Sequence, residues 1–115
     1  MPLTPLADRS TQARRGESMI EMVHVDFHLT PFRAERFASL YRPIVPRVLA
    51  YGAKGYAFYR SEEDPDHFVH ESLWEDRADF QRFWMSREMH LTRQKILGLY
   101  EQPVIPSWAT VLERG

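Results

Sequence analysis

The sequence contains no cysteine, which excludes disulfides, thiolate metal ligands and cysteine nucleophiles. It also lacks a charge excess, because its 115 residues carry a formal net charge of only −1. A chain without a net basic field is poorly suited to bind nucleic acid or an anionic membrane surface, so we expect neither as a partner. The absence of cysteine fits a reducing compartment, and we expect a cytoplasmic protein.

Apolar and aromatic residues are plentiful by comparison. Hydrophobic residues make up 43% of the sequence and aromatic residues 13%. A chain of this length forms one domain around a single core. The large apolar side chains exceed what a small two-layer domain needs for its own interior. We therefore expect part of the apolar surface to contact a second copy of the chain.

The first eighteen residues differ from the rest of the chain. Residues 1–18 mix Pro, Gly, Ser and Arg without periodicity, and we predict that they form a flexible N-terminal arm. Arg14 and Arg15 suggest the start of an export signal, but charged residues occupy the place where such a signal needs an apolar region. Residues 19–115 are predicted to form the folded domain.

The order of secondary structure indicates the fold class. Alternating or continuous apolar patterns predict strands over 20–29, 56–60, 68–75 and 108–112, and helical spacing predicts helices over 30–50, 76–85 and 86–100. The order strand, helix, strand, strand, helix, strand is that of the split βαβ arrangement. The sequence therefore predicts an α+β, ferredoxin-like βαββαβ domain.

Helix starts and breaks can also be read from single residues. Thr30 followed by Pro31 is typical of an N-cap and a first helical position, and Asp76 and Ser86 are good N-caps for the later helices. Two prolines inside the first helix each remove a backbone donor, so we predict a kink or restart near Arg42.

The run GAKGYAFYRSEEDPDHFVHESLWEDRADFQRFWMS carries a family resemblance. It has a glycine before a strand, an acidic turn with proline, a strand that ends in Trp74, and a helix with Phe80 six places on and Ser86 at its end. This pattern resembles the antibiotic biosynthesis monooxygenase family of the dimeric α+β barrel superfamily. The resemblance implies an antiparallel four-stranded sheet with helices on one face. It also implies a homodimer paired sheet to sheet and an apolar pocket between sheet and helices.

The resemblance suggests a function as well. Some members of the family oxidise phenolic polyketides with O2 and no cofactor, others degrade haem, and many have no known activity. It implies that this chain is a cofactor-independent monooxygenase acting on a phenolic or polyketide-like aromatic molecule. The alternatives are a non-oxidative, polyketide-cyclase-like enzyme and a protein that binds an apolar molecule without catalysis.

His70, Ser72 and Trp74 share one face of the predicted strand because side chains alternate with period two. The resemblance turns this face towards the pocket, where Trp and Asn line the site of monooxygenase members. His70 in place of Asn can act as a base, and Trp74 would orient the substrate. The ordinary alternative is a hydrogen-bonded strand histidine beside a core tryptophan. The other residues that we expect to line the pocket are Val25, Phe27, Tyr41, Ser72, Phe80, Phe83 and Trp84.

The chain also departs from the family pattern. Members often have Glu and His at the positions of Ser72 and Phe83, and these departures weaken the catalytic reading. Haem-degrading members need a histidine near the position of Arg93, whereas His90 lies one helical turn earlier. We therefore do not expect haem to be the cofactor.

His24, Asp26 and His28 alternate along the first strand and invite a metal hypothesis. Successive side chains on one strand face start roughly 6.6 Å apart, so a single ion can hardly bind both His24 and His28. We predict no metal here. We expect instead a polar network across a dimer interface, joined by Glu71 on the adjacent strand.

Overall fold

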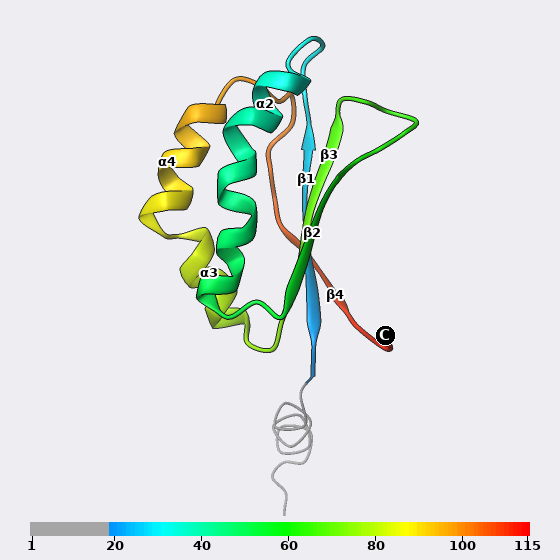
Figure 1. The fold of residues 1–115 in the computed structure, drawn as a ribbon, viewed down its shortest axis with the longest axis vertical. Coiled ribbons are helices and arrows are strands. Elements are labelled where there is room, and N and C mark those ends of the chain that lie inside the picture. The colour runs from blue at the N-terminus through cyan, green and yellow to red at the C-terminus, as the bar shows by residue number, and fades with distance from the viewer. Residues whose placement is uncertain (1–18) are drawn as a thin grey trace, which may run out of the picture.

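One antiparallel sheet with its helices on one side forms the framework of the protein (Figure 1). The computed structural model describes residues 19–115, so the arm predicted for residues 1–18 lies outside the described residues. The sheet has four strands in the order β2-β3-β1-β4, with every neighbouring pair antiparallel. The strands are β1 (Glu21–His28), β2 (Gly55–Arg60), β3 (His67–Trp74) and β4 (Ser107–Thr110). This order of elements confirms the predicted ferredoxin-like α+β fold.

The helices cover one face of this sheet (Figure 1). They are α2 (Ala34–Tyr41), the 3-10 helix η1 (Arg42–Tyr51), α3 (Arg77–Trp84) and α4 (Arg87–Ile96). In the described part of the chain, no helix is both long and apolar enough to cross a membrane.

The first helix begins later than the sequence predicts. Thr30 is not its N-cap, because the chain turns through Phe32 at a φ of 68° and α2 starts after Arg33, which makes no side-chain capping bond. The predicted break at Arg42 is confirmed as a change from α to 3-10 geometry. Pro46 lies four residues beyond Arg42 and has no N–H to donate to its carbonyl.

The predicted caps of the later helices are correct. The Asp76 carboxylate accepts from the Ala78 amide at 2.8 Å, and the Ser86 hydroxyl accepts from the Met89 amide at 3.2 Å. Each bond satisfies an N–H group that the first helical turn leaves free. The last helix ends at Ile96 rather than near residue 100, shortly before Gly98 takes a φ of 90°.

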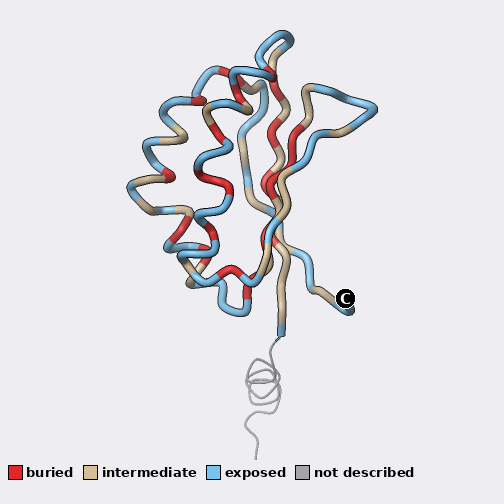
Figure 2. The backbone as a smooth tube through the Cα atoms, viewed as in Figure 1, coloured by how far each residue is buried: buried red, intermediate tan, exposed pale blue. Residues whose placement is uncertain are grey.

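The core lies between the sheet and the helices. Buried segments follow the strands and the sides of the helices that face the sheet (Figure 2). Strand register sorts the side chains, because residues paired across antiparallel strands point to the same face. Val23, Val25, Phe27, Phe68, His70, Ser72 and Trp74 face the helices, whereas His24, Asp26, His28, His67, Val69 and Glu71 face the other side. We call this second side the open face, since none of the helices in residues 19–115 covers it.

Candidate functional site

The most deeply buried polar contact of the described domain joins Tyr41 to His70. The Tyr41 hydroxyl lies 2.7 Å from His70 Nδ1, and the two residues are only 0% and 2% exposed. Tyr41 ends α2, where the rings of Phe27 and Phe37 hold it at centroid distances of 4.8 Å and 5.3 Å. His70 comes from the middle of β3. The helix and the sheet thus each supply one member of this Tyr41/His70 pair.

Burial sets the protonation of both groups. Loss of water lowers the pKa of His70 to about 4, and the backbone of Val45 partly opposes the shift without completing a hydrogen bond to the ring. Burial likewise raises the pKa of Tyr41 well above its usual range. Both side chains are therefore neutral at pH 7. A phenol that donates to Nδ1 assigns the imidazole proton to Nε2, which has no partner among the described residues.

Trp74 and Ser72 form a second buried polar contact on the same face. The Trp74 indole N–H donates to the Ser72 hydroxyl at 2.7 Å, so the serine satisfies the polar end of the tryptophan. The Trp74 ring packs against Phe80 and Phe83 at centroid distances of 5.6 Å and 6.4 Å. Alternation along β3 does place His70, Ser72 and Trp74 on one face.

The other predicted pocket residues surround these contacts. Val25, Phe27, Phe80 and Phe83 are all buried in the same core. Trp84 is only partly buried, stacks on Phe80 and lies beneath the Arg93 guanidinium, 4.7 Å from its ring centroid. The structure thus gathers the predicted residues around one core. A role for them in binding substrate stays a prediction.

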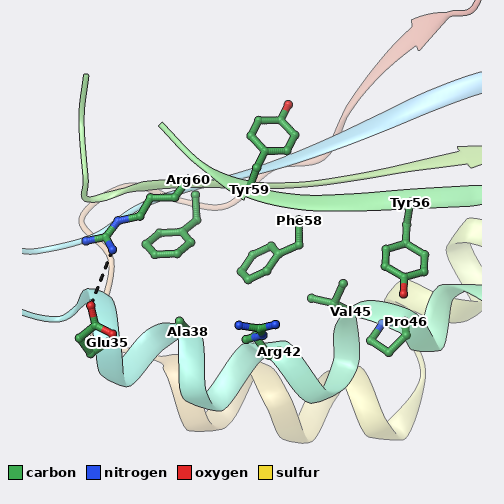
Figure 3. A pocket seen from close by; sticks show the side chains of 10 residues that line it. Glu35, Ala38, Arg42, Val45, Pro46, Tyr56, Phe58, Tyr59 and Arg60 are labelled. Atoms are coloured by element: carbon green, nitrogen blue, oxygen red, sulfur yellow. Dashed lines mark ion pairs between the residues drawn. The ribbon is translucent and has the colours of Figure 1, made fainter. Parts of the chain in front are cut away.

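A cleft of about 610 Å³ opens beside this core, between β2 and the α2/η1 segment (Figure 3). Its lining contains none of the residues that the sequence predicted for the site. The alternation of Tyr56, Phe58 and Arg60 on one face of β2 is the sequence signal that could have located it. The lining residues are Glu35, Ala38, Arg42, Val45, Pro46, Tyr56, Phe58, Tyr59, Arg60 and Phe68.

Phe58 separates the cleft from the Tyr41/His70 pair. Its ring lines the cleft and lies 5.5 Å from the Tyr41 ring and 6.2 Å from the His70 imidazole, measured between centroids. Val45 lines the same wall, and its backbone lies near the His70 ring and raises the pKa of that imidazole slightly. Phe58 therefore belongs both to the wall of the cleft and to the packing around the buried pair.

The two arginines of the cleft differ in the number of ion pairs and hydrogen bonds that they form. Arg60 donates to the Pro65 carbonyl at 2.7 Å, lies 3.7 Å from the Glu35 carboxylate and packs over the Phe68 ring. The Arg42 guanidinium lies between η1 and Phe58 (Figure 3) and forms no ion pair or hydrogen bond with any residue in 19–115. An anionic group entering the cleft would thus find one free cation beside an aromatic wall.

The open face holds the histidines for which the sequence predicted a polar network. His24 Nε2 lies 3.4 Å from a Glu71 carboxylate oxygen, to which the Tyr59 hydroxyl donates at 3.2 Å. Asp26 and His28 do not join this group and associate with His67 instead. The predicted contact between His24 and Glu71 is thus present within a single chain.

His90, the residue weighed as a haem ligand, lies exposed on α4. The position nearer the core is taken by Arg93, whose guanidinium packs on Trp84. The described residues therefore present no imidazole to this part of the core from α4.

Residues 21–95 match the family model of the antibiotic biosynthesis monooxygenases. The chain belongs to this family. Solved structures agree in fold: a Nitrosomonas europaea protein assigned to the same family superposes with a TM-score of 0.75 at 16% identity, covering 83% of this chain and 92% of its own. A Pseudomonas aeruginosa protein gives 0.73 at 20% identity over 84% and 97% of the two chains. No curated protein matches the chain.

Proposed function

We propose that the protein is a cofactor-independent monooxygenase that oxidises a phenolic or polyketide-like aromatic molecule. Membership of the monooxygenase family supports the class of reaction. The observation that carries the proposal for this chain is the aromatic cleft, which is separated from a buried, neutral histidine by one phenylalanine ring. A few polar groups beside an apolar cavity are typical of small-molecule sites.

In this proposal the substrate ring stacks on the cleft wall formed by Tyr56 and Phe58. Aromatic faces bind flat molecules by offset or edge contacts, and such contacts add to the area that they bury. Arg42 stabilises a phenolate oxygen, because a guanidinium within a few ångströms favours the charged form of an acid. The cleft thus lowers the cost of forming the electron-rich anion that reacts with O2.

The proposed role of the Tyr41/His70 pair begins when the substrate displaces the Phe58 ring. His70 acts as the base in the tautomer in which Nδ1–H donates to the Tyr41 oxygen and Nε2 carries the free lone pair. Nε2 then takes a proton from the substrate, and Trp74, fixed by its bond to Ser72, sets the plane of the ring. The anion passes electrons to O2. Overall a ring CH2 and O2 give C=O and water, so one oxygen atom enters the product and the other leaves reduced. The dry core excludes water from the reacting centre.

Oxygen consumption with a panel of anthrones and hydroquinones, without added flavin, haem or metal, tests the proposal. We expect uptake above the buffer rate, a loss of about 10² to 10⁴ in rate for His70→Asn if proton transfer limits turnover, and weaker binding for Trp74→Phe. If wild type is active and His70→Asn matches it, the base is assigned wrongly. If no compound raises oxygen uptake, the oxygenase proposal fails.

A second candidate function is binding without catalysis. It is favoured by the burial of His70, which lowers the pKa of the imidazole to about 4. Such an imidazole is a weak base. In the same panel, this function predicts a raised melting temperature with aromatic ligands and no oxygen uptake. Loss of that shift in Phe58→Ala would place the ligand in the cleft.

We also propose that the protein assembles as a homodimer through its open face. Homodimers that bind small molecules are typical of the family. The open face supports this arrangement because the exposed Tyr59 and the partly exposed Leu73 contribute apolar surface beside the histidines and carboxylates of β1 and β3. Light scattering at micromolar concentration should give twice the mass of one chain, and a mass of one chain contradicts the proposal.

A further inference from the structure

Three side chains that can bind a metal converge on the open face: Asp26, His28 and His67. One ligand atom from each lies within 4.8 Å of the other two. Asp26 Oδ1 and His67 Nε2 are 2.7 Å apart, and the imidazoles of His28 and His67 stack with centroids 4.3 Å apart and planes inclined by 15°. The cluster follows from strand register, since β1 pairs His28 directly with His67 and places Asp26 two residues earlier.

An acidic hollow borders this cluster. It has a volume of about 270 Å³, and its lining includes His28 together with the carboxylates of Asp64, Asp66 and Glu101. Backbone hydrogen bonds hold this region together, because the Leu29 amide donates to the Asp66 carbonyl and the Glu101 amide to the His28 carbonyl, at 2.9 Å and 2.8 Å. Several carboxylates around one hollow create a negative potential that attracts cations.

We propose that Asp26, His28 and His67 form a binding site for a divalent transition metal of the zinc type. Two imidazoles and one carboxylate are ligands that zinc and its neighbours accept, whereas magnesium and calcium prefer oxygen donors. Three protein ligands leave at least one position for water. The ion joins β1 to β3 at the end of the sheet next to the acidic hollow.

The geometry needs only side-chain adjustment. Ligand bonds of about 2.1 Å in a tetrahedral site separate ligand atoms by about 3.4 Å, so the tips of the side chains must shift by about 1 Å. The ion would replace the hydrogen bond between His67 Nε2 and Asp26 Oδ1, and both atoms would become ligands. The imidazole planes, already nearly parallel, can tilt about their side-chain bonds to aim both rings at one point.

His24 provides a matched control on the same strand face. It lies four residues from His28, about 13 Å along an extended strand, and pairs with Glu71. Removing the His24 imidazole therefore deletes a histidine from the open face without touching the proposed site. The chain has five histidines and no cysteine, and the two that remain are the buried His70 and the exposed His90 on α4.

Isothermal titration of the untagged full chain with zinc chloride tests the site. We expect one zinc per chain, an affinity at least tenfold weaker in His67→Ala and in Asp26→Asn, and unchanged affinity in His24→Ala and His90→Ala. Magnesium chloride should give no comparable binding. Zinc at a hundred times its Kd should raise the melting temperature of wild type by about 10–15 °C, because the ion binds only the folded state.

Several results would overturn the proposal. These are no zinc binding by wild type, equal binding by the two cluster variants, or a stoichiometry of one zinc per two chains, which would mean that copies share the ion. The melting curve of metal-free His67→Ala shows whether that variant folds. If it does not fold, Asp26→Asn still tests the site, because asparagine has nearly the same shape as aspartate. The titration uses no aromatic substrate, so its failure is separate from a failure of the oxygenase proposal.

Discussion

The two faces of the sheet use the same residue type in opposite ways. On the helix-covered face, His70 is 2% exposed, hydrogen-bonds with the Tyr41 hydroxyl, and has its pKa lowered to about 4 by burial. On the open face, His67 is partly exposed and lies 2.7 Å from the Asp26 carboxylate. One histidine is held neutral by its apolar surroundings, while the other has an acid within hydrogen-bonding distance. The surroundings, and not the residue type, decide which chemistry an imidazole can perform.

This difference divides the proposed functions between the faces. The helix-covered face offers apolar aromatic surface and a neutral proton acceptor, which suits chemistry on a flat organic molecule. The open face offers imidazoles beside carboxylates, which suits a cation or a polar interface between subunits. Variants that make the same change on both faces can therefore test whether the division is real.

The largest expected contrast is in stability. Phe27→Ala removes a ring that is 1% exposed and packs against Phe37 and Tyr41, so we expect it to lower the free energy of unfolding by about 3–5 kcal/mol. His24→Ala on the same strand deletes only a partly exposed contact with Glu71 and should cost about 1 kcal/mol or less. Urea unfolding of both variants measures the difference. Equal losses would mean that the open face is as tightly packed as the core.

The next contrast depends on pH. His70 has an ordinary pKa of 6.5 when unfolded and about 4 when folded, so between these values the unfolded chain binds a proton that the folded chain excludes. The free energy of unfolding should therefore fall as the pH drops from about 6.5 to about 4, by about 3 kcal/mol in total. The protein keeps this contribution in full above pH 6.5.

The control for this pH effect is His70→Asn, which cannot bind the proton. Urea unfolding of both proteins between pH 7 and pH 4 isolates the contribution of His70 from that of the carboxylates, which both chains share. If the two proteins lose stability in parallel, His70 is not held neutral by burial. In that case the rate of any reaction that uses His70 as a base would rise with pH through the ordinary histidine range.

Much of the fold could be predicted because local signals agree with one another. Alternation in β1 and β3 and the caps Asp76 and Ser86 each indicate the same arrangement as the packing. The start of α2 could not be predicted correctly. Thr30 and Pro31 carry a good helix-start pattern, yet backbone bonds from Thr30 to Leu99 and from Leu29 to Asp66 hold that segment in a turn. Contacts distant in sequence decided the outcome.

The candidate site was predictable only in part. Period-two alternation identifies which β3 residues share a face, but it does not show which cavities stay open after the helices pack. The cleft depends on how α2 and η1 approach the edge strand β2, and its cation, Arg42, lies at the change from α to 3-10 geometry. The cluster of Asp26, His28 and His67 was likewise hidden, because it requires the register between β1 and β3. Spacing within one strand argued against one ion binding both His24 and His28, but it could not reveal His67.

A smaller contrast uses one chemical change in the core. Tyr41→Phe removes only the hydroxyl that hydrogen-bonds with His70 Nδ1, which leaves a buried nitrogen without a partner. We expect a loss of about 1–3 kcal/mol in the free energy of unfolding, since an unsatisfied buried polar group keeps its desolvation cost. Adding His70→Leu to this variant should recover part of the loss, because both polar groups are then absent. If the double variant is no more stable than Tyr41→Phe, the cost does not come from the unpaired His70 imidazole.

The smallest effect is expected from the same change on the open face. Tyr59 is 44% exposed, and its hydroxyl donates to Glu71 at 3.2 Å, where water can replace it. Tyr59→Phe should therefore alter the free energy of unfolding by less than about 0.5 kcal/mol when measured on the monomer at low protein concentration. In the proposed homodimer the hydroxyl would be covered, so the same variant should weaken self-association as the concentration rises. Sedimentation equilibrium of wild type and Tyr59→Phe, with Tyr56→Phe in the cleft as the matched control, measures this. An unchanged association constant in Tyr59→Phe would place the subunit contact away from the open face.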